Sequence, residues 1–343
     1  MKSKNNITRE ELPTINFIGN KEKLTQWIFD NIDVDGKTFF DVFSGGCSIS
    51  YEAKKIGCKV ITNDILKINY FISKALIENK KIKLTDNDVN TLFSGKPVKG
   101  FMYENYSNVN FFPKECMQLD QYRKNIDMLS NPYKKALAFI LFRRSMIRKM
   151  PYSRFTIPWN KVVQLRDEEF SYKNYKRKRA YHNQTIREHF DENLDNYNNS
   201  IFDNSQDNKA YNKDIFDLIP KIEADIAYVD PPYAGTMSNY HGFYGLLDGF
   251  VKGKKTNSFK NDFADKTKSV ELFDELFLQL KKFDTWVLSY NNNAFPDKKQ
   301  ILSLIKKHSK KVKVIEKKHN YQVSGKNLKN NNREYLFIVK NNK

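Results

Sequence analysis

The sequence predicts an α/β fold in which a mainly parallel sheet is interrupted by a long insertion. Two short apolar runs, 38–43 and 59–65, each lead into polar residues, and a glycine turn and a helical segment lie between them. A third apolar run, 226–229, stops at an acid followed by two prolines. Between 96 and 205 this alternation disappears. Strands that alternate with helices are typical of a parallel sheet covered on both faces, so the irregular stretch is expected to be an insertion.

The charge of the chain favours a polyanionic partner. Its 343 residues carry a formal net charge of +19, and 14% of them are aromatic. An excess of Lys and Arg suits phosphate contacts, and aromatic rings can stack on bases. An AT-rich genome, whose codons favour Lys, Asn, Phe and Tyr, accounts for part of the same bias. The composition alone leaves both explanations open.

The cysteines and the hydropathy pattern indicate a cytoplasmic protein. Cys47, Cys58 and Cys116 show no pairing pattern and have no histidine nearby. Unpaired cysteines are usual in a reducing compartment, and a zinc site needs a cluster of ligands, so we expect no metal. No window resembles a signal peptide or an apolar span of about 18 residues, so we expect no membrane segment.

The first predicted element, residues 13–29, is a short strand, a turn at Gly19 and a helix. Lys21 stands at the start of that helix, where a positive charge is unfavourable beside the positive end of the helix dipole. An anion bound at the same place would remove this conflict. Lys21 is therefore expected to meet a carboxylate or phosphate, unless it is simply solvated.

Residues 38–65 form a predicted nucleotide-binding βαβ unit. Its first strand leads into Asp41-Val-Phe-Ser-Gly-Gly46, and its second strand ends at Asn63-Asp64. Glycines at such a turn let a ligand approach the backbone, and an acid at the end of the second strand is placed for ribose hydroxyls. The unit is therefore expected to hold a nucleoside.

The glycine turn also narrows the choice of nucleoside. It lacks the three spaced glycines that hold a pyrophosphate. A nucleoside without a pyrophosphate fits better, and S-adenosylmethionine is the common one. Asp41, Ser44 and the glycine amides would line its methionine end. A generic βαβ unit for an unknown ligand is the alternative.

The alternation of strands and turns resumes at 209–219, where a short strand ends in an acidic turn. Asp214 could accept a hydrogen bond from the adenine amine of the cofactor, while Ile215 or Phe216 covers the ring. Asp214 could equally cap the helix that follows. The sequence does not decide between these two roles.

The segment Asp230-Pro-Pro-Tyr233 ends a buried strand at the edge where ligands bind in open α/β sheets. Two prolines restrict the backbone, so the Asp230 carboxylate and the Pro231 carbonyl can be held as two acceptors facing one point. An amine on a flat ring has two N–H groups to donate to them, and the Tyr233 ring can stack on that ring. The alternative is a turn in which Asp230 caps the next helix.

The insertion contains a basic stretch with aromatic residues. Residues 141–180 hold twelve Lys and Arg against three Asp and Glu, a local net charge of +9. Such a stretch is a candidate for phosphate contact and base reading, although a solvated basic face is the usual alternative. The predicted DNA-binding residues are Arg143, Arg144, Arg148, Lys149, Arg154, Lys176, Arg177, Lys178 and Arg179.

Downstream of the Asp-Pro-Pro-Tyr segment, residues 234–245 are rich in glycine and aromatic residues. We interpret them as a mobile lid over the site or as an ordinary loop packed on the core. An amphipathic helix is expected at 268–282 and a strand at 286–291. The last elements are read as a hairpin around the loop 321–332, whose lysines either touch the DNA backbone or are solvated.

Four of these motifs occur together in a characteristic order. They are Phe17-x-Gly19-x-Lys21, Asp41-Val-Phe-Ser-Gly-Gly46, Asn63-Asp64 and Asp230-Pro-Pro-Tyr233. In this combination the sequence resembles the Dam-like, alpha-group DNA adenine-N6 methyltransferases. The resemblance covers most of 14–94 and 209–340. It is far more specific than any single motif.

The resemblance implies a Rossmann-like, S-adenosylmethionine-dependent methyltransferase core with an inserted target recognition domain. Residues 1–95 would then form the N-terminal, cofactor half of the core. Residues 96–208 would be the target recognition domain that binds DNA, and 209–343 the C-terminal, catalytic half.

The resemblance also implies roles for individual residues. In this family the lysine of the first motif meets the cofactor carboxylate, the glycine turn holds its methionine, and the strand-end acid binds its ribose. Cys47 departs from the family pattern, which often has Gly there, and would be tolerated if its side chain points inward. With the residues singled out above, the predicted cofactor-binding set is Phe17, Gly19, Lys21, Asp41, Phe43, Ser44, Gly45, Gly46, Asp64, Asp214 and Ile215.

The implied reaction is methyl transfer from S-adenosylmethionine to N6 of an adenine in double-stranded DNA. The target base cannot be reached in the stack, so it would be flipped into a pocket. Tyr233 would stack on it, and Asp230 and Pro231 would accept both amine hydrogens, aiming the N6 lone pair at the methyl group. Catalysis would rest on positioning and electrostatics. The predicted catalytic residues are Asp230, Pro231, Pro232 and Tyr233.

Other functions stay open at this stage. The Asp of the tetrapeptide favours adenine over cytosine-N4, and the long basic insertion argues for duplex DNA over RNA. A non-catalytic, sequence-specific DNA-binding protein and a plain ribonucleoprotein factor are alternatives from other classes. For a methyltransferase, we expect a host-protective partner of a separately encoded restriction endonuclease, with regulatory marking of DNA as the second choice.

Overall fold

The computed structural model describes residues 11–17, 19–176, 180–232, 234, 240–255, 262–319 and 332–341. The chain forms two compact units. One consists of Met1–Ile18 and Lys74–Ser205, and the other of Gly19–Ser73 and Gln206–Lys343. We call them the helical unit and the sheet unit.

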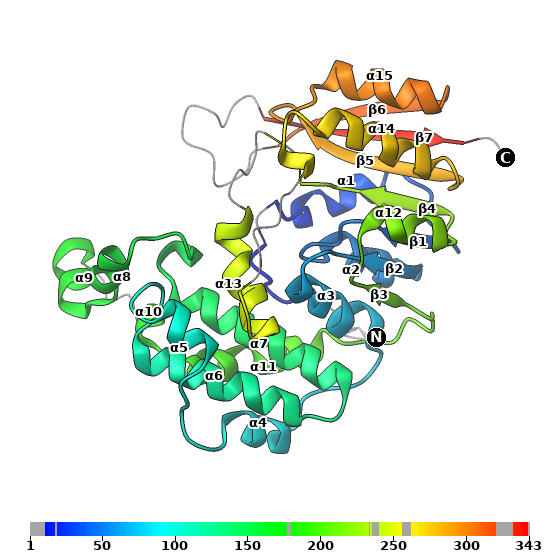
Figure 1. Ribbon diagram of the computed structural model, residues 1–343. Coiled ribbons are helices and arrows are strands. Elements are labelled where there is room, and N and C mark those ends of the chain that lie inside the picture. The colour runs from blue at the N-terminus through cyan, green and yellow to red at the C-terminus, as the bar shows by residue number, and fades with distance from the viewer. Residues whose placement is uncertain are drawn as a thin grey trace, which may run out of the picture. The chain divides into compact units, whose positions relative to one another are not determined.

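The sheet unit is built on seven strands in the order β3-β2-β1-β4-β5-β7-β6 (Figure 1). Strands β1 to β5 run parallel to one another, whereas β7 runs antiparallel between β5 and β6. The strands are β1 (Thr38–Asp41), β2 (Lys59–Asn63), β3 (Lys209–Tyr211), β4 (Ile226–Val229), β5 (Thr285–Asn291), β6 (Val312–Lys318) and β7 (Arg333–Lys340). This mixed α/β sheet confirms the predicted fold class.

The strand order reverses between β1 and β4. From β1 the chain proceeds outward to β2 and β3, and β4 then starts on the other side of β1. Ligands of open α/β sheets bind beyond the carboxyl ends of the strands at such a switch point. The fold therefore places the functional edge where β1, β2 and β4 end.

Helices cover both faces of this sheet. The helices of the sheet unit are η1 (Glu22–Leu24), α1 (Thr25–Phe29), α2 (Ser48–Ile56), α3 (Lys67–Ser73), α12 (Ile215–Leu218), η4 (Ile219–Lys221), α13 (Tyr240–Lys252), η5 (Asp262–Ala264), α14 (Ser269–Leu280) and α15 (Lys298–His308). The predicted amphipathic helix at 268–282 is α14.

Successive residues of β1 show how the two faces are filled. The Phe39 ring lies 5.8 Å from Phe29 of α1, whereas the next ring, Phe40, lies 6.0 Å from Phe283, which follows α14. The alternation follows from the pleat of a strand, and both rings are fully buried. On the α14 face Trp286 stacks on Phe277, with centroids 5.0 Å apart. A strand buried on both faces reads as a continuous apolar run, which is why β1 and β4 were recognisable.

In its described part the helical unit contains no strand. Its helices are η2 (Lys74–Glu78), α4 (Asp86–Phe93), α5 (Phe101–Tyr106), α6 (Pro113–Met128), α7 (Pro132–Lys149), η3 (Pro151–Ser153), α8 (Trp159–Arg166), α9 (Glu168–Tyr175), α10 (Ala180–Asn183) and α11 (Ile186–Asn199). Phe142 of α7 packs on Phe190 of α11, with ring centroids 4.9 Å apart. The same aromatic cluster includes Phe93 and Tyr122.

The strand expected before Gly19 is absent, and that prediction was wrong. Residues 11–17 have no regular structure. Their carbonyls are bound by side chains instead of a neighbouring strand: Tyr197 Oη donates to the Thr14 carbonyl at 3.0 Å, and Arg143 donates to the carbonyls of Ile15 and Asn16. The expected helix is also divided, since a 3₁₀ turn precedes α1.

The C-terminal hairpin is confirmed as the pair β6–β7, while residues 320–331, which contain most of the predicted loop, lie outside the described residues. Within the described chain no helix combines the length and apolar character needed to cross a membrane.

Candidate active site

Acidic and polar residues gather where β1, β2 and β4 end. Asp41 is the last residue of β1, Asn63 ends β2 with Asp64 next, and Asp230 follows β4 directly. In the register of the sheet Asp41 is paired with Thr62 on one side and Tyr228 on the other. The three acids predicted from the sequence therefore share one edge.

The glycine turn is anchored to the end of β2. Ser44 donates its backbone N–H to the Asn63 carbonyl at 2.9 Å, and its hydroxyl donates to the same oxygen at 3.1 Å. Gly45 has a φ of +48°, in the left-handed region that favours glycine. The Gly45 N–H donates to Asp64 Oδ2 at 3.0 Å. The glycine turn and the Asp64 carboxylate thus fix each other's position.

Cys47 completes the turn and precedes α2. Its φ of +62° is left-handed, and its side chain is fully buried. The Sγ atom lies 3.1 Å from the Ser73 hydroxyl, and burial raises the pKa of the thiol far above its usual value. The side chain of Cys47 therefore points inward, which is the condition under which we expected Cys at this position to be tolerated. The left-handed backbone is a physical reason why a glycine would also suit this position.

Asp64 is a buried acid with every oxygen engaged inside the chain. Besides Gly45, Leu66 N donates to Oδ1 at 2.8 Å and Asn69 Nδ2 to Oδ2 at 3.2 Å. Burial raises the pKa of Asp64 to about 6, although these donors act in the opposite direction. A carboxylate oxygen can accept more than one hydrogen bond, so a ribose hydroxyl remains compatible with this arrangement.

Asp41 has one paired and one unpaired oxygen. Ser50 donates its hydroxyl to Oδ2 at 2.5 Å, whereas Oδ1 is buried without a hydrogen-bond partner among the described residues. Burial raises the pKa of Asp41 to about 7, and the nearby charges of Asp230 and Asp64 add to the rise. A buried, unpaired acceptor costs stability unless a donor arrives from outside. Asp41 is therefore suited to a cationic ligand group.

Asp230 is paired with Lys21 of the first motif. The Lys21 Nζ lies 3.0 Å from Asp230 Oδ1, and the two side chains are 4% and 19% exposed. Burial raises the pKa of Asp230, while the Lys21 ammonium lowers it. The sequence predicted that Lys21 meets a ligand carboxylate. In the structure it contacts the carboxylate of the candidate catalytic residue.

Asp214 caps α12. Its Oδ1 accepts a hydrogen bond from Phe216 N at 2.9 Å, which is the second of the two roles that the sequence left open. Ile215 is buried, and the Phe216 ring stacks on Phe263 with centroids 6.3 Å apart. Phe43 meets Phe263 edge-on at 5.6 Å. These rings form an aromatic wall beside the glycine turn.

Two members of this edge were missed by sequence reasoning as site residues. The side chain of Asn63 accepts from Lys213 N at 3.0 Å and donates to the Lys213 carbonyl at 3.1 Å, so it fixes the turn before Asp214. Phe263 belongs to the short turn η5 and has no flanking apolar periodicity. Asn63 was visible as a motif residue, whereas nothing in the local sequence marks Phe263.

The comparison with known proteins decides the family. Residues 17–304 match the model of the D12 class N6 adenine-specific DNA methyltransferases. The chain belongs to this family. It is an adenine-N6 DNA methyltransferase.

Its relatives agree with this assignment. The chain is 54% identical to the Type II methyltransferase M2.HphI of Haemophilus parahaemolyticus, over 98% of this chain and 100% of the relative. It is 24% identical to the Type II methyltransferase M.CviAII of Paramecium bursaria Chlorella virus 1, over 95% and 98%. It is 25% identical to the Type II methyltransferase M.FokI of Planomicrobium okeanokoites, over 85% of this chain and 47% of the relative.

The remaining predicted site residues of this methyltransferase are placed as follows. Pro231 is buried and Pro232 is half-buried after β4, while Tyr233 and 235–239 lie outside the described residues. The interpretation of 234–245 as a lid or an ordinary loop is wrong for Tyr240–Gly245, which begin helix α13 despite two glycines. Phe17 lies in the irregular N-terminal segment, and Gly19 has a φ of +84°.

Two of the predicted DNA-binding residues are buried inside the helical unit. Arg143 is 1% exposed and donates to the carbonyls of Ile15 and Asn16. Lys149 is 2% exposed and lies 2.9 Å from Glu115 Oε1, which Arg166 also binds. Although burial opposes it, Arg166 and Lys149 lower the pKa of Glu115 to about 2. The expectation that Arg143 and Lys149 contact DNA does not fit this burial.

Four of the other predicted contacts are exposed or half-buried. Arg154 and Lys176 are exposed, and Arg144 and Arg148 are half-buried. Arg144 donates to the side chains of Asn193 and Asn16. Arg177, Lys178 and Arg179 lie outside the described residues.

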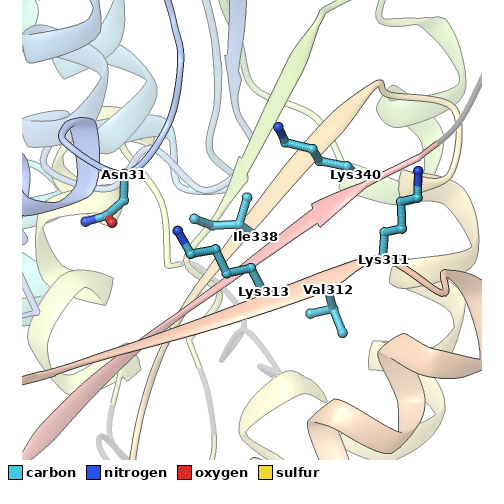
Figure 2. Close-up of a pocket in the computed structure, with 6 residues that line it drawn as sticks. All are labelled: Asn31, Lys311, Val312, Lys313, Ile338 and Lys340. Carbon is cyan, nitrogen blue, oxygen red and sulfur yellow. The ribbon is translucent and has the colours of Figure 1, made fainter.

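A basic hollow on the sheet unit lies away from the acids. Figure 2 shows it lined by Asn31, Lys311, Val312, Lys313, Ile338 and Lys340. Lys340 is paired with Thr285, the first residue of β5, so the hollow is at the amino ends of the parallel strands. The candidate active site is at their carboxyl ends. Among the described residues no group of His, Cys, Asp and Glu is arranged to hold a metal.

Proposed function

We propose that this methyltransferase uses S-adenosylmethionine to methylate adenine that has been flipped out of double-stranded DNA, at the edge formed by Asp41, Asp64 and Asp230. The observation that carries the proposal is the Lys21–Asp230 ion pair beside the glycine turn. It brings the first and the last motif together at the end of β4.

The residues of the turn fit the methyl donor. The buried, unpaired Oδ1 of Asp41 is an acceptor for the ammonium of the methionine part. The glycine turn, whose Ser44 and Gly45 amides donate within the chain, would pack against the methionine, and Asp64 would accept from the ribose. Phe43, Ile215 and Phe216 would offer apolar contact for the adenine. When bound, this cofactor supplies an electrophilic methyl group.

Asp230 would bind the target amine. Its carboxylate accepts one N–H of the exocyclic amine and the Pro231 carbonyl accepts the other, which orients the nitrogen lone pair toward the methyl donor. Lys21 opposes the effect of burial and favours the ionised form of Asp230, because an ammonium at 3.0 Å stabilises the charge. Tyr233 would stack on the flipped base, and Pro232 would restrict the turn. Rate enhancement would then come from orientation and electrostatics.

We assign the enzyme to the Dam-like, alpha group on its motif order, with the cofactor motif before the catalytic motif and the recognition part between them. In functional terms 1–95 and 209–343 would be the cofactor and catalytic halves, and 96–208 would recognise the target. The compact helical unit, Lys74–Ser205, contains most of that recognition part.

The DNA contacts that we propose are the predicted basic residues that are not buried in the described part of the helical unit, together with three that lie outside the described residues. They are Arg144, Arg148, Arg154 and Lys176, together with Arg177, Lys178 and Arg179. Arg143 and Lys149 are left out because they are buried.

We further propose that the enzyme acts in the cytoplasm and protects host DNA from a separately encoded restriction endonuclease. The names of its relatives support this role, since several are Type II methyltransferases and others are modification methylases.

The test is transfer of labelled methyl from S-adenosylmethionine to unmethylated duplex DNA, followed by mapping of the modified base. Asp230→Ala is compared with Asp207→Ala, an equal substitution at a 71% exposed acid. We expect N6-methyladenine at one short sequence, lost only in Asp230→Ala. Label in RNA or at cytosine-N4 would overturn the substrate. Equal activity of the two variants would overturn the role of Asp230.

A further inference from the structure

Helix α13 carries a fully buried acid among apolar residues. Asp248 has no exposed surface, and its neighbours Leu247 and Phe250 are buried as well. A buried carboxylate is costly unless charged or polar groups engage it. Lys252, one turn later, places its Nζ 2.5 Å from Asp248 Oδ2. The other oxygen points to a different element.

That second contact is with helix α3. The backbone N–H of Ile68, in the first turn of α3, donates to Asp248 Oδ1 at 3.1 Å. The first N–H groups of a helix have no partner within the helix, so a side chain from elsewhere has to satisfy them. A negative charge is also favourable at this end of the helix dipole. Asp248 therefore holds α3 from outside, as a cap supplied by another helix.

Helix α3 in turn holds the candidate cofactor site at two points. Asn69 donates to Asp64 Oδ2 at 3.2 Å. One helical turn later, the Ser73 hydroxyl lies 3.0 Å from the Ser44 hydroxyl and 3.1 Å from Cys47 Sγ. A shift of α3 would move both the strand-end acid and the glycine turn.

The position of α13 in the chain gives this contact its significance. Among the described residues it is the first helix after Asp230, and it contacts the helix that holds Asp64 and the glycine turn. We propose that Asp248 is a positioning residue, which sets the glycine turn and Asp64 for the cofactor through α3 and ties their geometry to helix α13. The inference rests on the proposed function of this edge as the cofactor site.

A merely structural role for Asp248 makes different predictions. A buried acid that only stabilises the unit would lower the unfolding temperature when removed, and hydrogen exchange would rise throughout the sheet unit. Substitution of a positioning residue selectively changes the affinity for the cofactor and the amide hydrogen exchange of α3. These changes are also largely absent when the substituted side chain keeps the acceptor oxygen.

The experiment compares Asp248→Ala, Asp248→Asn and Lys252→Gln with the wild type. Lys252→Gln is the matched control, because it removes the ion pair and leaves the Asp248–Ile68 hydrogen bond. Titration calorimetry with S-adenosylmethionine gives the dissociation constant, steady-state kinetics separate KM from kcat, and amide exchange is followed over 64–73. Thermal unfolding reports the stability of each variant.

We expect Asp248→Ala to weaken cofactor binding about tenfold, with kcat at saturating cofactor within about threefold of the wild type. Exchange over 64–73 should rise in this variant. Asp248→Asn and Lys252→Gln should stay within about threefold in affinity, because each keeps an acceptor for Ile68 N.

Unchanged affinity in Asp248→Ala, or a uniform rise of exchange without rescue by Asn, would overturn the inference. If the wild type itself bound no S-adenosylmethionine, the proposed function would fail. The exchange of 64–73 in the free variants would then still decide whether Asp248 holds α3.

Discussion

The Nζ of Lys21 lies 3.0 Å from Oδ1 of Asp230, across 209 residues of sequence. The pair joins the first motif of the chain to the acid at the end of β4. Burial raises the pKa of Asp230 and Lys21 opposes the rise, so the ammonium preserves the form of the carboxylate that accepts a hydrogen bond.

Lys21→Met should therefore change the pH dependence of methylation. Without the ammonium the pKa of Asp230 rises further, and the acidic limb of kcat moves to higher pH. At saturating cofactor we expect kcat to fall about tenfold or more near pH 6 and less near pH 9. Lys23→Met, at an exposed neighbouring lysine, is the control and should leave the profile unchanged. An equal loss at every pH would contradict this account.

Asp41→Asn should stabilise the free enzyme while weakening cofactor binding. The folded chain keeps a proton on Asp41 up to about pH 7, whereas the usual value is 3.8. Between these values the folded state binds more protons than the unfolded state, so stability falls as the pH rises. At pH 8 we expect Asp41→Asn to gain about 1–2 kcal/mol. Its affinity for S-adenosylmethionine should fall about tenfold.

The measurement for Asp41 is urea unfolding of the cofactor-free protein at pH 5.5 and pH 8. The stability of Asp41→Asn should depend less on pH than that of the wild type. Some dependence should remain, because burial also raises the pKa of Asp64 to about 6. A variant that is destabilised at pH 8 would show that the Ser50 hydrogen bond outweighs the burial of the charge.

Cys47 offers a test of backbone strain at the glycine turn. Its φ of +62° is unfavourable for a residue with a Cβ. Cys47→Ala keeps that strain and loses the contact with Ser73, whereas Cys47→Gly loses the same contact and the strain. We expect the Gly variant to be the more stable of the two by about 1 kcal/mol, measured as the free energy of unfolding in urea. A more stable Ala variant would show that the turn is not strained.

Substitutions of Arg154 and Arg143 should distinguish a side chain that contacts DNA from one that supports the fold. Arg154 is exposed. Arg154→Ala should therefore reduce by about one the slope of the logarithm of the DNA-binding constant against the logarithm of the salt concentration. Arg143 is buried against Ile15 and Asn16, so Arg143→Ala should lower the unfolding temperature and leave the slope unchanged. Binding titrations on duplex DNA at several salt concentrations measure both. A changed slope in Arg143→Ala would return it to the set of DNA contacts.

The strands of the catalytic edge could be predicted because their signals are local. Strands β1, β2 and β4 are short, mainly apolar segments that end at Asp41, Asn63 and Val229. A strand buried on both faces is nearly continuous in apolar residues, so such segments can be recognised in the sequence. The acids at their ends then share an edge by topology alone. The family resemblance assigned their chemistry.

What could not be predicted depends on contacts distant in the sequence. Lys21 has no local feature that indicates Asp230 as its partner. Arg143 belongs to a basic run that is typical of an exposed surface. In the structure the irregular segment before Gly19 packs over Arg143, and its guanidinium donates to two carbonyls of that segment. Asp248 lies in an apolar helix whose glycines suggested a loop. In each case a distant backbone group or charge decides the role of the side chain.

The place of β7 inside the sheet has a consequence for synthesis of the enzyme. Among the described strands β6 pairs with β7 alone, and β5 has β7 as its neighbour on one side. Until residues 333–340 have left the ribosome, β5 therefore presents an open hydrogen-bonding edge and β6 has no partner. A nascent chain that already contains every methylation motif would still be an incomplete and association-prone sheet. Methylating activity is thus expected to appear only after β7 has been made, however early the motifs are translated.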